Sequence, residues 1–306
     1  MKYPMAVFLL LLSVCLNNAC KVAKHSAGAV SRNIPKELIQ FTRHPQNPIF
    51  SGSGSDTWDK QIRERGFILK ENETYHLWYT GYSSKDITKF LGYATSNDGI
   101  NWKRYQDDPI YKDGWVEDVF VVQSENTYYM FAEGRGDTAH MLTSTDKIHW
   151  TEKGNLNIVK TDGTPIEKGA FGTPTVYIEN GIWHLFYERD DRGIWLATST
   201  DLVIWENVQD EPVIAMGPSS YDSFAVAMNQ VIKYKGLYYG YYHASAYKDW
   251  HEWSTNIAVS KDLVHWKKYE QNPILGNNES SGIVVHDGKK FRMYTMHRKI
   301  NVYLPK

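Results

Sequence analysis

The segment SNDGINW, residues 96–102, combines a Ser-x-Asp turn with a tryptophan four residues after the aspartate. The pattern Ser-x-Asp-x-x-x-Trp recurs as STDKIHW (144–150), STDLVIW (199–205) and SKDLVHW (260–266). We expect each aspartate to cap backbone N–H groups of its turn, and each tryptophan to pack between neighbouring repeats. Because the four aspartates recur identically, they are predicted to be structural.

An aromatic, strand-like stretch precedes each copy, and a fifth stretch ends the repeat series. These stretches are YHLWYTG (75–81), YYMFAEG (128–134), WHLFYER (183–189), YYGYYHA (238–244) and FRMYTMH (291–297). Successive stretches start 53, 55, 55 and 53 residues apart. A regular period of this length, built from short strands and turns, is typical of a β-propeller. The sequence therefore predicts an all-β fold, a five-bladed β-propeller.

The last repeat is too short to contain its own outer strand. The N-terminal segment QFTRHPQNPIF (40–50) fits the frame of the missing strand, with Phe41 at the tryptophan position and Pro48 at the proline that follows. We therefore expect this N-terminal strand to close the ring, which removes the free sheet edges.

The first 20 residues have the features of an export signal. Lys2 precedes an apolar run, residues 5–15, of the length of a secretory signal core. Cys15 and Cys20 are the only cysteines, and either fits a lipidated residue of a bacterial lipoprotein. We predict a signal peptide (1–20), a linker (21–35) and the propeller (36–306). A lipoprotein-type signal and ordinary cleavage with release are the two alternatives for the signal peptide, and a lipid anchor on its cysteine is the only membrane contact expected. The expected location is periplasmic, outer-membrane-anchored or extracellular.

Composition narrows the partners. The mature chain has no cysteine for a disulfide or for thiol chemistry. Its formal net charge of −1 argues against nucleic acid and against an anionic membrane surface as partners. The 11 Trp and 21 Tyr serve blade packing, sugar stacking or both.

Two carboxylates occupy matching positions at the start of inner strands. Glu64 in blade one and Asp118 in blade two are followed, at the same register, by Gly172-Thr173, Met228-Asn229 and Ser280-Ser281. Carboxylates that point into one channel are what acid/base cleavage of a glycosidic bond needs. The structural alternatives are an ion pair for Glu64 and a turn for Asp118.

Further polar residues are expected at the same end of the ring. Glu133, Glu188, His243 and His297 end the second strands, which return toward the start of the first strands. Arg63, Arg65 and Asp222 precede or begin inner strands. We predict Glu64, Asp118 and Glu188 as catalytic residues. The predicted substrate-binding residues are Arg63, Arg65, Glu133, Asp222, His243 and His297. Solvated strand ends and backbone-bonded histidines are the alternatives.

The blade pattern GYATSNDGINW (92–102), VEDVFVVQSENTYYMFAEG (116–134) and GTPTVYIENGIWHLFYE (172–188) resembles the five-bladed β-propeller glycoside hydrolases. These include families 43, 32, 62, 68 and 117 and the mannoside-acting family 130, and the resemblance covers residues 40–306. In families like 43, it implies a base at Glu64, where an aspartate is usual, and an orienting residue at Asp118. Gly172-Thr173-Pro174 replaces the usual Glu-Gly-Pro of the acid, so Glu188, Glu133, Asp222 or His297 would supply that function.

The favoured function is an exported, exo-acting glycoside hydrolase that cleaves a plant, algal or host oligosaccharide or polysaccharide. A family-130-like glycoside phosphorylase is the second possibility, with Arg63, Arg65, Arg135, Arg189 and Arg298 as candidate phosphate ligands. A non-catalytic glycan-binding propeller is the third. No cofactor is expected, and no spacing typical of a metal site is present. The resemblance allows a structural calcium ion.

Overall fold

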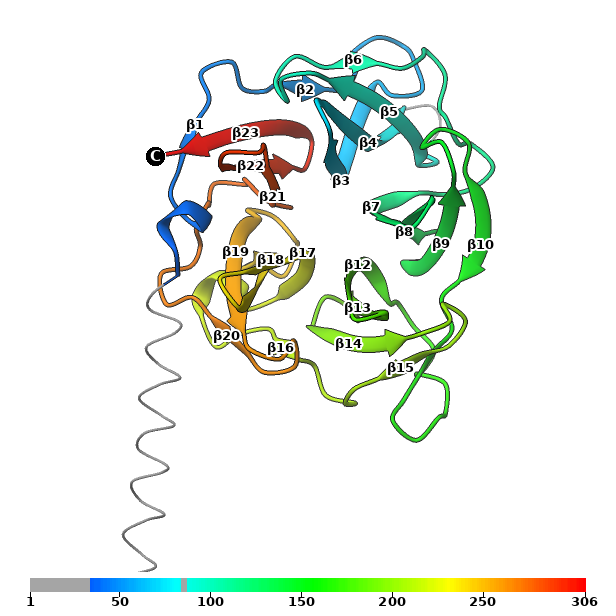
Figure 1. Ribbon diagram of the computed structural model, residues 1–306, viewed down its shortest axis with the longest axis vertical. Coiled ribbons are helices and arrows are strands. Elements are labelled where there is room, and N and C mark those ends of the chain that lie inside the picture. Colours follow the sequence, from blue (N-terminus) through cyan, green and yellow to red (C-terminus); the bar gives the residue numbers. More distant parts are fainter. Residues whose placement is uncertain (1–33, 84–86) are drawn as a thin grey trace, which may run out of the picture.

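The computed structural model describes residues 34–83 and 87–306, and its five β-sheets surround a central axis (Figure 1). The prediction of an all-β, five-bladed propeller is confirmed. The predicted signal peptide and residues 21–33 of the linker lie outside the described residues. Within the described part of the chain, no helix has the length and apolar character needed to cross a bilayer.

The four main strands of each of the first four blades run from the inner to the outer strand in chain order, with antiparallel neighbours; in blade three, β11 (Ile158–Val159) adds a parallel strand outside β15 (Trp205–Asn207). Blade one contains β3 (Gln61–Glu71), β4 (Thr74–Tyr82), β5 (Phe90–Ser96) and β6 (Lys103–Arg104). Blade two contains β7 (Glu117–Ser124), β8 (Thr127–Gly134), β9 (Thr138–Ser144) and β10 (Thr151–Asn155). Blade three contains β12 (Gly172–Glu179), β13 (Ile182–Glu188), β14 (Gly193–Ser199) and β15 (Trp205–Asn207), with β11 (Ile158–Val159) and β16 (Ile214–Ala215) at its edge. Blade four contains β17 (Ala225–Tyr234), β18 (Leu237–Ser245), β19 (Ser254–Ser260) and β20 (Trp266–Lys268).

Blade five combines the two ends of the chain. It contains β21 (Ile283–His286), β22 (Phe291–Met296) and β23 (Lys299–Pro305), and its outer strand is β1 (Phe41–Arg43). β1 pairs antiparallel with β23, with Phe41 opposite Pro305, and β2 (Phe50–Ser51) pairs with the other end of β23. The predicted closure by the N-terminal strand is therefore present (Figure 1).

The repeated turns have the predicted structural function. In the first turn, Asp98 Oδ1 accepts the backbone N–H groups of Ile100 and Asn101, both at 2.8 Å, and the other three aspartates accept the equivalent pairs. Three of the four tryptophans pack on an aromatic ring of the preceding blade. Trp150 contacts Trp78 with ring centroids 6.2 Å apart, and Trp205 and Trp266 pack in the same way on Phe131 and Phe186. These contacts join consecutive blades.

A β-bulge interrupts the inner strands of blades one to four near the end where each strand begins. Asp118 and Thr173 lie in these bulges with φ of 49° and 45°, in the left-handed region. A bulge redirects the side chains next to it and leaves one residue outside the ladder. The residues singled out by their register, Asp118 and Thr173, thus lie where the backbone turns side chains away from the regular strand pattern.

Arg65 of β3 joins four blades beneath the bulges. Its guanidinium donates to the backbone oxygens of Asp118, Pro174 (2.7 Å) and Met228 (2.9 Å) and to Thr175 Oγ1 (2.6 Å). The side chain is completely buried. Blades two, three and four are therefore hydrogen-bonded to one cation supplied by blade one.

Candidate active site

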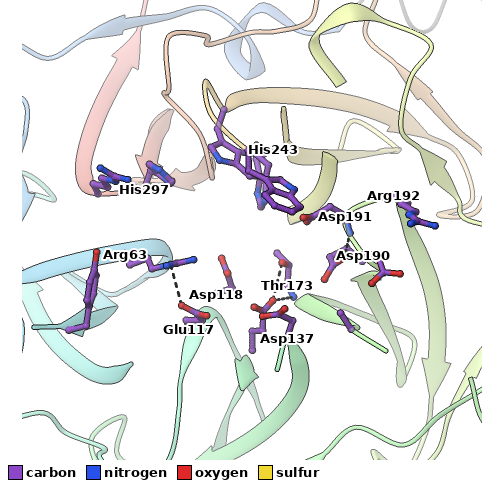
Figure 2. Close-up of a pocket in the computed structure, with 17 residues that line it drawn as sticks. Arg63, Glu117, Asp118, Asp137, Thr173, Asp190, Asp191, Arg192, His243 and His297 are labelled. Carbon is purple, nitrogen blue, oxygen red and sulfur yellow. Dashed lines mark hydrogen bonds and ion pairs between the residues drawn. The ribbon is translucent and has the colours of Figure 1, made fainter. Parts of the chain in front are cut away.

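A pocket of about 760 Å³ lies at the end of the ring where the inner strands begin. Its lining is mostly charged. Seven residues carry carboxylates: Glu117, Asp118, Glu133, Asp137, Glu188, Asp190 and Asp191. Three arginines, Arg63, Arg192 and Arg298, and two histidines, His243 and His297, complete the charged and titratable lining. Figure 2 shows the carboxylates of blade two on one side of the pocket, with His243 and His297 on the other.

Asp118 and Glu117 lie at the start of β7, at the bulge. Asp118 Oδ1 accepts the backbone N–H of Arg65 at 3.2 Å, and Asp118 is buried. Glu117 accepts the indole N–H of Trp115 at 3.1 Å and lies 3.5 Å from Arg63 Nε. The backbone N–H of Arg65 thus holds the Asp118 carboxylate in place, and the indole N–H of Trp115 holds that of Glu117. Fixed positions of this kind are what an acid/base site requires.

Glu133 and Glu188 end the second strands of blades two and three and converge above Gly172. Glu133 Oε2 accepts the N–H of Thr173 at 2.9 Å, and Glu188 Oε1 accepts the N–H of Gly172 at 2.9 Å. A Cβ atom on residue 172 would overlap the Glu133 carboxylate and lie 2.9 Å from Glu188 Oε1. A glutamate side chain at this position would therefore collide with Glu133 and Glu188, which occupy its space.

Burial and the negative charges of neighbouring carboxylates favour the protonated forms of these two glutamates. Desolvation, with a contribution from Asp191, raises the pKa of Glu188 to about 7. Desolvation and then the charges of Asp118, Glu117 and Glu188 raise the pKa of Glu133 well above its usual value. A glutamic acid that keeps its proton near neutral pH is suited to act as a general acid.

The raised pKa of Glu188 predicts a pH-dependent stability. Between pH 4.5 and pH 7 the folded state holds a proton that the unfolded state has released, so the free energy of unfolding falls as pH rises through this window. The expected contribution is about 3 kcal/mol. In Glu188→Gln this contribution should be absent, so the variant should gain stability relative to the wild type between pH 4.5 and pH 8. Urea unfolding at several pH values measures both slopes, and parallel slopes would contradict the prediction.

Most of the predicted site residues lie in this pocket. They are Arg63, Asp118, Glu133, Glu188, His243 and His297. His243 Nδ1 lies 2.7 Å from the side-chain amide of Asn229. In blade four, Asn229 belongs to the pair Met228-Asn229, which matches the position of Asp118 in blade two. Glu64 belongs to β3, but its side chain is outside the described part of the structure. Its catalytic assignment stays a prediction.

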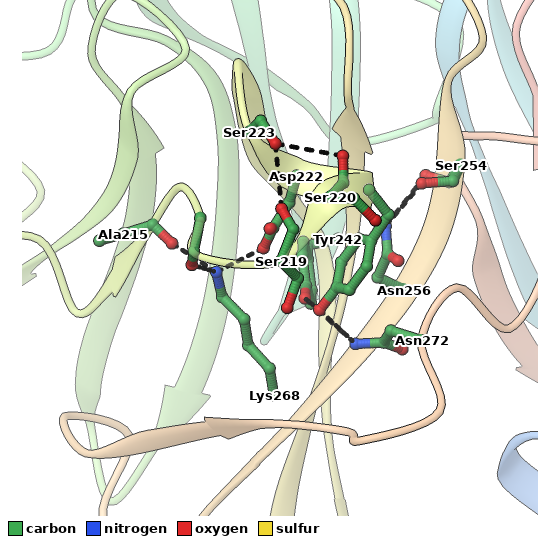
Figure 3. A network of polar contacts seen from close by, with 12 residues as sticks. Ala215, Ser219, Ser220, Asp222, Ser223, Tyr242, Ser254, Asn256, Lys268 and Asn272 are labelled. Carbon is green, nitrogen blue, oxygen red and sulfur yellow. Dashed lines mark hydrogen bonds and ion pairs between the residues drawn. The ribbon is translucent and has the colours of Figure 1, made fainter.

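Arg65 and Asp222, both predicted to bind substrate, lie away from the pocket lining. Arg65 is turned beneath the pocket, since the bulge in β3 shifts the register between Arg63 and Phe67. Asp222, in the short helix η2 (Ser220–Asp222), is fully buried and pairs with Lys268 Nζ at 2.5 Å (Figure 3). Lys268 also donates to the backbone oxygens of Ala215 and Gly217. Both assignments are corrected to structural ones.

The loops between second and third strands supply pocket residues that sequence reasoning missed. Asp137 follows β8, Asp191 and Arg192 follow β13, and Trp250 and Trp253 follow β18. The backbone N–H of Asp191 donates to Glu188 Oε2 at 2.6 Å, so this loop also holds Glu188. Their position in the sequence could have indicated them, because these loops follow directly on the strand ends that contain Glu133, Glu188 and His243.

Three carboxylates of blade two form a group that sequence spacing did not reveal. Oxygens of Glu117, Glu133 and Asp137 lie within 4.8 Å of one another. Carboxylate oxygens are the ligands that Ca²⁺ prefers, so these residues would hold such an ion if the protein binds one.

Comparisons with known proteins find relatives that are glycoside-processing enzymes. No protein-family model matches it. A 1,2-β-oligomannan phosphorylase from Thermoanaerobacter sp. (strain X514) is 26% identical over 227 residues, which are 68% of this chain and 73% of the relative. A β-1,2-mannobiose phosphorylase from the same organism is 29% identical over 184 residues, 52% of this chain and 58% of the relative.

Solved structures agree with the fold. One is a structure from family 130 of mannoside phosphorylases. That family is described as containing glycoside hydrolases that target β-1,2-mannosidic linkages in Candida mannan. This structure has a TM-score of 0.72 at 16% identity and covers 90% of this chain and 96% of its own. The resemblance to five-bladed propeller glycosidases and phosphorylases is confirmed at the level of the fold.

Proposed function

We propose that this protein is a glycoside hydrolase that acts on β-1,2-linked mannosides. The observation that carries the hydrolytic part is the charge of the pocket, with seven carboxylate residues and three arginines in its lining. Buried carboxylates with raised pKa values support acid/base cleavage of an acetal. The same negative charge opposes the binding of a phosphate dianion.

The residues suggest a division of the chemistry. Glu188 holds a proton near neutral pH and lines the pocket, so it is the proposed donor to the bridging oxygen as the glycosidic bond breaks. The Asp118 carboxylate accepts the backbone N–H of Arg65 and lines the same pocket as Glu188. Asp118 is the proposed base that takes a proton from the attacking water. The water oxygen then bonds to the anomeric carbon.

The relatives support the choice of sugar. The two curated relatives are named for β-1,2-mannan and β-1,2-mannobiose, and the structural neighbour is described with β-1,2-mannosidic linkages. The pocket lies at one end of the propeller channel, and the Arg65 side chain crosses the channel beneath it. A pocket that is closed below admits the end of a glycan chain, which fits an exo-acting enzyme. The predicted export signal is consistent with an extracellular or periplasmic glycan as substrate.

Phosphorolysis is the second candidate, because both curated relatives are named as phosphorylases. Of the five arginines considered as phosphate ligands, Arg63 and Arg298 line the pocket, and Arg192 joins them. Arg65 is buried under the pocket, Arg189 pairs with Glu167 at 2.9 Å and Arg135 lies over Trp115. Fewer cations therefore face the site than the sequence suggested.

The test incubates the purified protein with β-1,2-mannobiose, with and without inorganic phosphate. Hydrolysis releases mannose at the same rate in both conditions, which is the expected result. Release of mannose 1-phosphate that requires phosphate would establish the phosphorylase instead. Binding of the disaccharide without any release would favour the non-catalytic glycan-binding propeller.

A further inference from the structure

The loop between β18 and β19, residues 246–253, is a distinctive part of the pocket rim. Its sequence AYKDWHEW contains three aromatic residues, and two of them, Trp250 and Trp253, line the pocket. The loop has eight residues, whereas the equivalent loops have three in blade two, four in blade three and two in blade five. Blade four thus has the longest of these four loops, and it contributes two tryptophans to the pocket lining.

Trp250 differs from every other tryptophan of the chain. All 11 tryptophans lie in the described residues, and only Trp250 is exposed, at 56%. Among the described residues, no aromatic ring packs against its indole, and its indole N–H makes no hydrogen bond. Trp253, by contrast, contacts the His243 ring with centroids 5.0 Å apart. A large exposed apolar group beside a pocket commonly marks a ligand contact.

The backbone holds Trp250 in an unfavourable conformation. Its φ is 53°, and that of Glu252 is also 53°, in the left-handed region that a bulky residue rarely adopts. The loop is nevertheless held by its own contacts, because the N–H of Trp250 donates to Tyr247 O at 3.1 Å and the Tyr247 ring stacks on His251 at 3.9 Å.

Two other exposed rings belong to the same part of blade four. Phe224 is 46% exposed and Tyr247 is 41% exposed. The N–H of Phe224 donates to Ser245 O, at the base of the loop. We call Phe224, Tyr247 and Trp250 the aromatic rim. The rim is apolar, whereas the pocket beside it is lined by carboxylates and arginines.

We propose that Trp250 forms a second sugar-binding subsite on this rim. A sugar ring has an apolar face of C–H groups, which an indole covers, and its edge carries hydroxyl groups that polar side chains bind. One sugar unit is then held by the charged pocket and a later unit of the same chain stacks on Trp250. The preferred ligand is therefore an oligosaccharide longer than a disaccharide. The identity of the sugar rests on the proposed function.

The experiment compares kcat/KM for β-1,2-mannotetraose and β-1,2-mannobiose in the wild type and in Trp250→Ala. The wild type is expected to prefer the tetrasaccharide, and the variant to lose this preference by about tenfold, mainly in KM. Trp250→Tyr should restore most of the preference. Tyr105→Ala, which removes a 54% exposed ring that lies outside the pocket lining, is the matched control. A preference that Trp250→Ala retains, or an equal loss for both substrates, would overturn the inference.

Failure of the proposed function is distinguishable. If the wild type releases sugar from neither substrate, isothermal titration calorimetry tests the subsite directly. The ligands are disaccharides and tetrasaccharides of three kinds: β-1,2-linked, β-1,4-linked and xylose-based. Tighter binding of a tetrasaccharide than of its disaccharide, lost in Trp250→Ala, would support the subsite. Equal affinity for both lengths, or no binding of any of these sugars, would overturn it.

Discussion

Replacing Asp118 by asparagine is expected to lower kcat by about a thousandfold, within the range for loss of a general acid or base. The change replaces the proposed base by an amide that cannot take a proton from water, at a buried position where the carboxylate accepts the backbone N–H of Arg65. Asparagine keeps an acceptor for that N–H, so the bulge at the start of β7 should persist. The expected melting temperature is within about 2 °C of the wild type.

The control for this variant is Asp108→Asn, the same change at an exposed aspartate in the loop between blades one and two. It should leave both kcat and the melting temperature unchanged. Steady-state kinetics on β-1,2-mannobiose and differential scanning calorimetry give the two quantities. Wild-type turnover in Asp118→Asn would show that the reacting carboxylate lies elsewhere in the pocket, whereas a large loss of stability would make Asp118 structural.

The sequence predicted the fold because a propeller repeats its local interactions. Each Ser-x-Asp turn is satisfied within seven residues, and each tryptophan needs only the neighbouring blade, so identical residues recur at a fixed period. Asp118 was found in the same way, since a fixed distance from the aromatic strand leads to the bulge in the inner strand of blades one to four. Periodic features were therefore predictable, including the strand that closes the ring.

The site residues that were misplaced depend on features that are not periodic. The direction of Arg65 changes at a bulge, and the position of Asp222 depends on the path of the long connection between blades three and four. Glu133 and Glu188 converge above Gly172 because blades two and three lie side by side, and the sequence of either blade alone does not indicate this contact. Sequence reasoning identified the loss of a glutamate at residue 172, and packing explains how its volume is filled.

Replacing Arg65 by methionine is expected to lower the free energy of unfolding by at least about 4 kcal/mol, as for a buried ion that loses its partner. Oxygens of Asp118, Pro174, Thr175 and Met228 would each lose a donor. Methionine fills much of the volume, so the loss reports hydrogen bonds and charge more than a cavity. Calorimetry should show a melting temperature lower by about 10 °C.

Arg63→Met is the matched control, two residues earlier in the same strand. Arg63 has a side chain that is 46% exposed and lies 3.5 Å from Glu117, so its loss should change stability by less than about 1 kcal/mol. Similar melting temperatures for the two variants would contradict the structural assignment of Arg65. The difference matters for the site, because the Arg65 cation lies beneath Asp118 and Glu133 and offsets part of their mutual repulsion. An acidic pocket of this density therefore depends on a cation that the substrate does not contact.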